Sequence, residues 1–171
     1  MRVLLGLVLV GILGCGPTAA ERYTQLKVEA EAEVEKGYHA NNELKDHDTA
    51  ILHFTEAIKI AQQLESDALG GHRQILGRSY NGLGLCYLGK GDDDKALAEF
   101  DEAIRIYDAT KRFASSGVVN RFRQGIYRRK AEKASTAEER AKFEALADQE
   151  DLEAQVNRKL DQERTRRRQS Q

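Results

Sequence analysis

An internal repeat is the sequence feature that most limits how this chain can fold. Residues 50–60 read AILHFTEAIKI, and residues 96–106, which lie 46 positions later, read ALAEFDEAIRI. In the first copy Ala50, Phe54 and Ala57 are spaced i, i+4 and i+7, so they share one apolar face of a helix. A period of roughly 20–50 residues is typical of stacked helical units that bury their apolar faces against one another. The repeat therefore predicts an all-α stack of helix pairs.

Composition supports a single helical domain and excludes several classes of protein. The 171 residues include one proline, Pro17, so no proline interrupts a helix within the repeats. A formal net charge of -1 argues against a protein that mainly coats nucleic acid, and we expect no nucleic-acid partner. The two cysteines, Cys15 and Cys86, are too few for a multi-disulfide scaffold or a four-cysteine zinc site.

The second copy of the repeat carries the fuller pattern. Aromatic, small and apolar residues stand at helical spacing on both sides of a Gly-Asp turn, at Tyr80, Leu83, Gly84, Tyr87, Gly91, Ala96, Phe100 and Ala103. Residues 77–108 therefore resemble a tetratricopeptide repeat, and the resemblance implies a solenoid of helix-turn-helix units. The family's usual proline after the second helix is replaced by Asp108, so we expect that helix to continue through Tyr107.

The first copy is looser than the second. We expect its helices over residues 21–41 and 49–66, joined by a turn that holds one extra residue before Ala50. Glycines near position 70 then mark a break, and the next helix is expected over residues 72–88.

The third copy is degenerate and completes the predicted solenoid. Gly125 stands where Gly84 stood in the second copy. A Ser-Thr-Ala-Glu-Glu capping signal follows, and it predicts a long C-terminal capping helix over residues 138–164. The helical domain is expected to span residues 21–164, followed by a basic, disordered tail over residues 165–171.

The N-terminal segment has the pattern of a leader. Residues 3–13 form an apolar run without charge, which is shorter than the ~20 residues that a membrane-spanning helix needs. The Ile-Leu-Gly-Cys sequence ending at Cys15 resembles a bacterial lipobox, which implies a signal peptide over residues 1–14 and a diacylated Cys15. Residues 15–20 would then be a tether. The alternative is an ordinary secretory signal cut further on, which would remove Cys15.

The lipobox resemblance also implies where the protein is located. It predicts an exported protein that is anchored by lipid in the cell membrane or outer membrane, facing the periplasm or the cell exterior.

No pattern in the sequence indicates an enzyme, a cofactor or a metal site. There is no phosphate-binding glycine loop, nucleophile elbow or paired-histidine zinc helix. Cys86 lies on the packed side of a helix and is interpreted as a buried packing residue. Glu35, His39 and Glu43 are spaced four apart and could bind a divalent metal, although a solvated charged face is the commoner arrangement.

Binding is the better class of function. In tetratricopeptide repeats the first helix of each pair lines a concave groove that holds an extended peptide or a partner helix. This resemblance implies eight groove residues, namely Tyr38, Arg78, Asn81, Leu85, Leu88, Phe122, Ile126 and Arg129. Val34 and Tyr38 occupy the positions of the family's carboxylate clamp, so a clamp of that kind is not supported.

Charge is unevenly distributed along the chain. Residues 111–130 carry seven lysines and arginines and no acidic residue. Such a surface either attracts an acidic ligand or partner, or is a solvated helical face. The arginines from Arg164 onward either contact an anionic lipid or another polyanion, or keep the end of the chain soluble.

The sequence therefore predicts a membrane-anchored, non-catalytic scaffold that binds an unidentified protein partner in a concave groove. Two alternatives stay open. One is a small-ligand or metal-binding helical protein that uses His39 and Glu43, and the other is a subunit of a secretion or export assembly.

Overall fold

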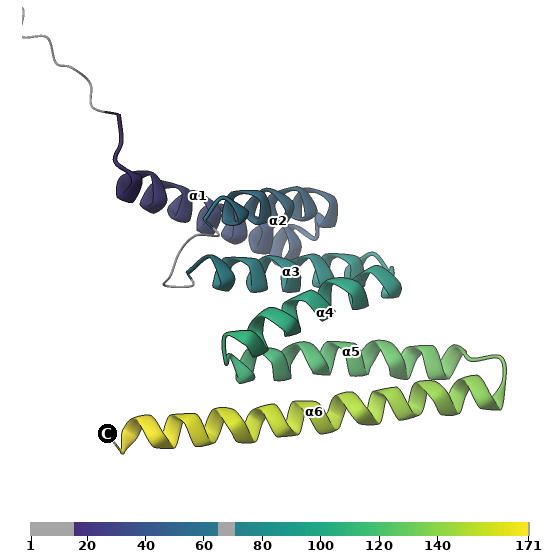
Figure 1. Cartoon of the computed structure of the whole chain (residues 1–171). Helices are drawn as coiled ribbons and strands as arrows, with labels where there is room; N and C mark the ends of the chain where they lie inside the picture. Colours follow the sequence, from purple (N-terminus) through teal and green to yellow (C-terminus); the bar gives the residue numbers. More distant parts are fainter. Residues whose placement is uncertain (1–15, 65–70, 171) are drawn as a thin grey trace, which may run out of the picture.

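The computed structural model describes residues 16–64 and 71–170. These residues form α-helices and one short π-helix, with no strand among them. In chain order the elements are α1 (Ala19–His39), η1 (Ala40–Leu44), α2 (His47–Gln62), α3 (Gly71–Gly89), α4 (Asp93–Ala109), α5 (Phe113–Lys133) and α6 (Ala137–Gln169). The predicted all-α stack of helix pairs is confirmed (Figure 1).

The helices form three antiparallel pairs that stack along one direction. α1 packs on α2, α3 on α4, and α5 on α6, while α2 contacts α3 and α4 contacts α5 (Figure 1). α1 also contacts α3 directly, so the first helices of the first two pairs lie next to each other. The main contacts of α5 are with α6 and α4 instead. The row of first helices is therefore continuous only across α1 and α3.

Glycines let the repeated phenylalanines enter the helix interfaces. Phe54 is fully buried between α1 and α3, where a Cβ built on Gly37 or Gly82 would lie 2.8 or 2.3 Å from its ring. Phe100 takes the equivalent place in the second pair, 2.4 Å from a Cβ built on Gly84. Real side chains do not approach this closely, so each ring fits only because its neighbour lacks a side chain.

The helix ends explain why the repeats need no proline. α3 and α4 are each followed by a left-handed residue, Gly91 with φ 77° and Lys111 with φ 55°. At the second site the Arg112 N–H donates to the carbonyl of Tyr107 at 2.7 Å, and the Lys111 N–H donates to that of Asp108 at 3.0 Å. This pair of bonds is a Schellman motif, which satisfies the last carbonyls and turns the chain away from the helix. α4 continues past Tyr107 as predicted, and it ends at Ala109.

The extra residue expected in the first turn forms a π-helix. η1 follows α1 without a break and closes where Lys45 takes the left-handed conformation at φ 56°. The next residue is Asp46, whose carboxylate accepts a hydrogen bond from the Thr49 N–H at 3.0 Å and caps α2. A π turn widens the helix by one residue, so the insertion is absorbed without shifting α2.

In the third pair a different glycine lies at the close contact between helices. A Cβ on Gly125 would meet only the Arg129 side chain at 3.9 Å, so this glycine does not replace Gly84. The close approach lies at Gly117, where a Cβ would be 3.4 Å from the backbone oxygen of Ala154 on α6. The glycine positions therefore differ between pairs even though the helix-pair architecture is kept.

α6 extends further than the sequence predicts. The tail after residue 164 was expected to be disordered, but residues 165–169 form the last turns of α6. Two interactions stabilise these last turns. The arginines there interact favourably with the negative end of the helix dipole, and Arg164 donates a hydrogen bond to the backbone carbonyl of Lys111. The solvent side of α6 is not wholly polar, because Leu152, Val156 and Leu160 are exposed there.

The predicted leader and the first residue of its tether, Cys15, fall outside the part of the chain that is described, whereas the rest of the tether is described and its last two residues already belong to α1. Residues 1–15, which hold the expected signal peptide and Cys15, are not among the described residues. The described helices include none that is both long and apolar enough to cross a membrane.

Candidate functional site

Three of the predicted groove residues meet on the shared face of α1 and α3. The Tyr38 hydroxyl donates to the backbone carbonyl of Arg78 at 3.0 Å, and the Asn81 amide donates to the Tyr38 oxygen at 3.3 Å. The Arg78 guanidinium lies 5.6 Å from the centre of the Tyr38 ring and pairs with Glu35 at 2.5 Å. We call these four residues, Glu35, Tyr38, Arg78 and Asn81, the α1–α3 network.

The network is half-buried and polar. Burial raises the pKa of the Tyr38 hydroxyl, which therefore stays protonated and keeps donating its hydrogen bond at neutral pH. The side-chain oxygen of Asn81 has no hydrogen-bond partner among the described residues. Glu35 stays mostly exposed beside it. The face therefore presents the Glu35 carboxylate and the partly exposed Arg78 guanidinium to anything that docks on it, whereas the Asn81 amide oxygen is buried.

Buried side chains form two hydrophobic cores, the first around Phe54 and the second around Phe100. The apolar groove residues lie in the second core. Leu85, Leu88 and Phe122 are partly buried and pack against Phe100 and its neighbours. The Phe122 ring stacks on that of Phe100, with centroids 5.7 Å apart. The three residues do lie together, but they form part of the interface between the second and third helix pairs. Most of their surface is buried in that interface.

Ile126 and Arg129 do not belong to an open groove. Ile126 is 0% exposed, so the prediction that it contacts a partner is wrong. Arg129 pairs with Asp93 at the start of α4, with 2.7 Å between nitrogen and oxygen. The burial of Ile126 and the ion pair of Arg129 have the same cause. α5 packs against α4 and α6 and does not continue the face that α1 and α3 share.

Glu35, the first of the three possible metal ligands, does not lie with His39 and Glu43. His39 contacts Glu43 at 3.1 Å, but Glu35 pairs with Arg78 and not with them. α1 ends at His39 and η1 changes the helical pitch, so the three residues no longer share one face. Among the described residues, no three side chains of the metal-ligating types gather in one place.

Cys86 lies in the first hydrophobic core. It is fully buried, and burial raises the pKa of its thiol to about 12. A thiol that stays protonated is a poor nucleophile, so this residue is a packing residue as expected.

Tertiary packing pairs three of the seven basic residues in the stretch over residues 111–130 with carboxylates. Lys130 pairs with Asp94 at 2.6 Å, and Arg123 contacts Asp101 and Glu150, each at 3.1 Å. The acidic partners come from α4 and α6 and are distant in sequence. The surface charge is therefore much less one-sided than the sequence indicates.

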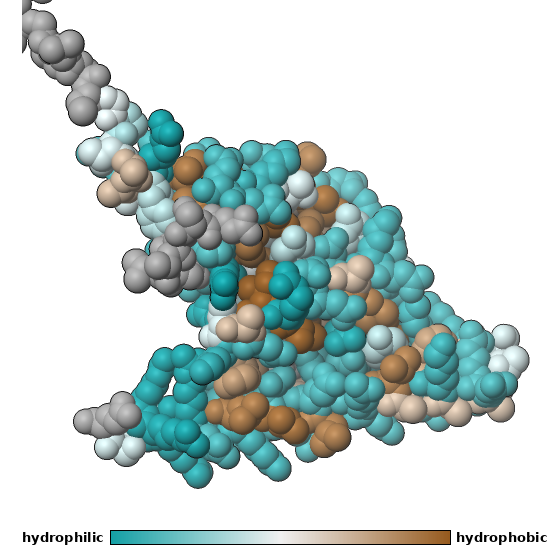
Figure 2. Space-filling model, viewed as in Figure 1, coloured by the Kyte–Doolittle hydropathy of each residue, from teal (hydrophilic) through white to brown (hydrophobic). Residues whose placement is uncertain are grey.

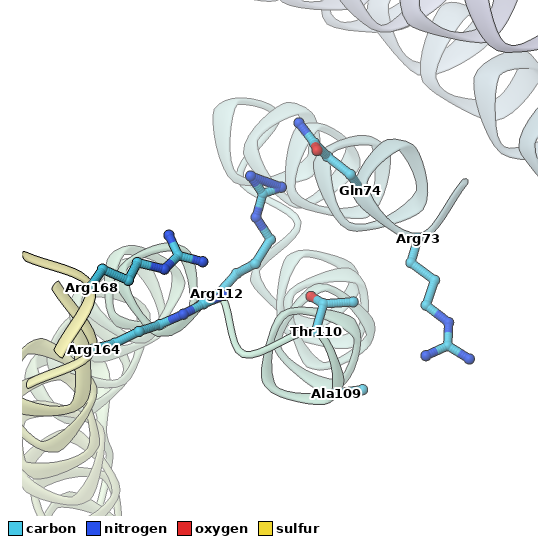
Figure 3. Close-up of a pocket in the computed structure, with 7 residues that line it drawn as sticks. All are labelled: Arg73, Gln74, Ala109, Thr110, Arg112, Arg164 and Arg168. Atoms are coloured by element: carbon cyan, nitrogen blue, oxygen red, sulfur yellow. The ribbon is translucent and has the colours of Figure 1, made fainter. Parts of the chain in front are cut away.

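A cavity that the sequence did not identify lies on one lateral edge of the stack, where the second and third helix pairs meet (Figure 1). It has a volume of about 490 Å³ and is formed by the start of α3, the end of α4 with its following turn, and the end of α6. Arg112, Arg164 and Arg168 lie side by side in it, with Arg112 extending toward Gln74, whereas Arg73 points away from them (Figure 3). The sequence shows clustered arginines near the C-terminus, but it gives no sign that Arg112 joins them.

Comparison with protein families gives a match over part of the chain. Residues 30–109 match the family model described as tetratricopeptide repeat. This range begins within α1 and ends with α4, so it spans the α1–α3 network and stops before the degenerate third pair. Comparison with curated proteins and with solved structures gives no match.

Proposed function

We propose that this chain, an all-α tetratricopeptide-repeat solenoid, is a non-catalytic scaffold that binds a protein partner on the α1–α3 face. Tetratricopeptide repeats bind protein partners, and the match covers α3 and the second half of α1, which together carry the α1–α3 network. The partner would be an extended peptide or a helix.

The α1–α3 network is the observation that carries the proposal. Asn81 and the Arg78 carbonyl fix the Tyr38 hydroxyl, and Glu35 fixes the Arg78 guanidinium, so the exposed carboxylate and guanidinium are already oriented to bond the polar groups of a peptide. Preorganised polar groups lose little conformational freedom when a partner binds. The partly buried Leu85 continues the same helix and would add apolar contact.

The test is a crosslinked pull-down from native membranes with the full chain. We expect Asn81→Ala and Glu35→Lys each to reduce recovery of the co-purifying protein, because both alter the α1–α3 face. The matched control is Lys59→Ala, since Lys59 is exposed on α2 and pairs only with Glu56 in its own helix. Equal recovery with all three variants would refute binding on this face.

We also propose that the scaffold is held at a bacterial membrane by a lipid on Cys15. The proposal rests on the resemblance of the sequence ending at Cys15 to a lipobox. Two acyl chains are enough for stable anchoring, because each buried CH₂ contributes about 0.8 kcal/mol. Thr18 caps α1 through a reciprocal pair of hydrogen bonds with Glu21, so the folded part begins three residues after Cys15.

Membrane fractionation tests the anchor separately from partner binding. We expect the unchanged protein to fractionate with membranes and to carry the mass of an acylated N-terminal cysteine. Cys15→Ala would release the protein into the soluble fraction. Retention of Cys15→Ala in the membrane fraction, or an unacylated mass for the unchanged protein, would refute the anchor.

A further inference from the structure

The arginine cavity at the edge of the stack has the chemistry of an anion site. Arg112, Arg164 and Arg168 bring three guanidinium groups to one cavity. Among the described residues, no carboxylate forms an ion pair with any of the three, whereas Arg123 and Arg129 of α5 are both paired. Unpaired cations of like sign repel one another, so an anion bound between them would relieve an unfavourable arrangement.

The neighbouring groups of the cavity also favour an anion. Gln74 and Arg73 lie in the first turn of α3, where the helix dipole is positive. Arg164 is held in place by its hydrogen bond to the carbonyl of Lys111, which leaves its remaining N–H groups for a ligand. Guanidinium groups match the oxygens of a phosphate bidentately, and this makes arginine the usual residue at phosphate sites.

The position of the cavity indicates where the phosphate comes from. α1 and α6 belong to opposite ends of the stack, but the start of α1 and the C-terminal end of α6 lie along the same lateral edge of it (Figure 1). The surface is hollowed and hydrophilic beside the end of α6 (Figure 2). Four residue steps separate Cys15 from the start of α1, and an extended chain of that length reaches at most about 14 Å. A lipid on Cys15 would therefore keep this edge of the stack close to the bilayer surface.

We propose that the cavity formed by Arg112, Arg164 and Arg168 binds the phosphate groups of anionic membrane lipids and turns this edge of the stack toward the bilayer. The orientation, though not the phosphate chemistry, rests on the proposed lipid anchor. The α1–α3 face would then stand upright from the membrane, accessible to a partner from the side.

The experiment measures vesicle binding by the full chain carrying Cys15→Ala, so that no acyl chain contributes. Vesicles of phosphatidylcholine alone are compared with vesicles that also contain phosphatidylglycerol. The apolar N-terminal segment is present in every sample, so the difference between the two vesicle types isolates the anionic lipid. The test variant is Arg112→Gln with Arg168→Gln. The control is Arg128→Gln with Arg140→Gln, which removes equal charge from exposed positions near the opposite end of α5 and α6.

We expect the test variant to lose roughly tenfold or more of its preference for phosphatidylglycerol vesicles, because each basic residue near an anionic surface contributes severalfold to binding. The control should change by less than about twofold in the same assay. Circular dichroism melts of both variants establish that each is folded.

Three results would overturn the proposal. Equal losses in the test and control variants would mean that binding depends on diffuse charge only. No preference for phosphatidylglycerol would exclude the lipid source. Arginine-dependent stabilisation by inorganic phosphate without any vesicle preference would make the cavity a site for free phosphate. Failure of the anchor alone appears as an unacylated Cys15 in the unchanged protein, and it leaves the vesicle result independent.

Discussion

Glu150 is a buried carboxylate whose charge should make the protein less stable as pH rises. It is 3% exposed, and one of its oxygens lies 3.1 Å from an Arg123 nitrogen. The other oxygen has no hydrogen-bond partner among the described residues. Burial raises the pKa of this carboxyl to about 7, against the opposing attraction of Arg123, while Glu153 and Asp101 add to the rise.

The sign of the pH dependence follows from proton binding. The folded protein holds the Glu150 proton more tightly than the unfolded chain, whose glutamate pKa is near 4.5. The free energy of unfolding therefore decreases as pH rises from about 4.5 to about 7, and it levels off above that range. A tenfold difference in proton affinity corresponds to about 1.4 kcal/mol, so the decrease is of the order of 3 kcal/mol.

Replacing Glu150 by glutamine keeps the shape of the side chain and removes its charge. At about pH 5 the wild-type carboxyl is mostly protonated, and Glu150→Gln should change the free energy of unfolding by less than about 1 kcal/mol. At about pH 8.5 the variant should be more stable than wild type by roughly 1–3 kcal/mol, because Arg123 keeps its contact with Asp101.

Urea denaturation followed by far-ultraviolet circular dichroism measures both values. The control is Glu144→Gln, since Glu144 is exposed on the same helix. Its effect should be small and the same at both pH values. If Glu150→Gln changes stability equally at the two pH values, or destabilises at high pH, the reasoning about the buried charge is wrong.

Four further predictions concern packing, helix ends and the thiol. Gly82→Ala should lower the free energy of unfolding by roughly 1–3 kcal/mol, since its Cβ would lie 2.3 Å from the Phe54 ring; a neutral result in urea denaturation would contradict the tight fit. Lys111→Gly should raise it by about 1 kcal/mol, because φ is 55° there, and destabilisation would count against backbone strain. Asp92→Ala should cost about 1 kcal/mol, since its carboxylate caps α4, and Asp92→Asn should retain most of that stability. Cys86 should react with iodoacetamide only after unfolding, since it is buried with a pKa of about 12; prompt labelling of the native protein, located by mass spectrometry, would contradict this.

The candidate binding face was partly predictable from sequence. Tyr38, Arg78 and Asn81 were identified from their register in the repeats, and they do lie together, because α1 and α3 have the neighbouring arrangement that the pattern implies. The same register failed for Ile126, which is fully buried. Its helix follows the repeat pattern weakly, and a weak pattern does not specify which face of a helix is covered by the next one.

By itself, the sequence determined that this chain folds into stacked helix pairs. The helical spacing of Ala50, Phe54 and Ala57, repeated 46 residues later, defines an apolar face on each helix. The glycines that accommodate the two phenylalanine rings are also visible in the sequence. These are local properties, since a helix face depends only on residues a few positions apart.

Only the tertiary structure decided how the third pair sits and what surrounds its charges. Contacts between α5 and α6 bury Glu150 beside Arg123, and the end of α6 returns to bring Arg164 and Arg168 beside Arg112. These residues are between 27 and 56 positions apart along the chain. Whether they come together depends on the angles at which the helices cross. These angles result from many small packing contacts over the whole stack, and they leave no periodic signal in the sequence.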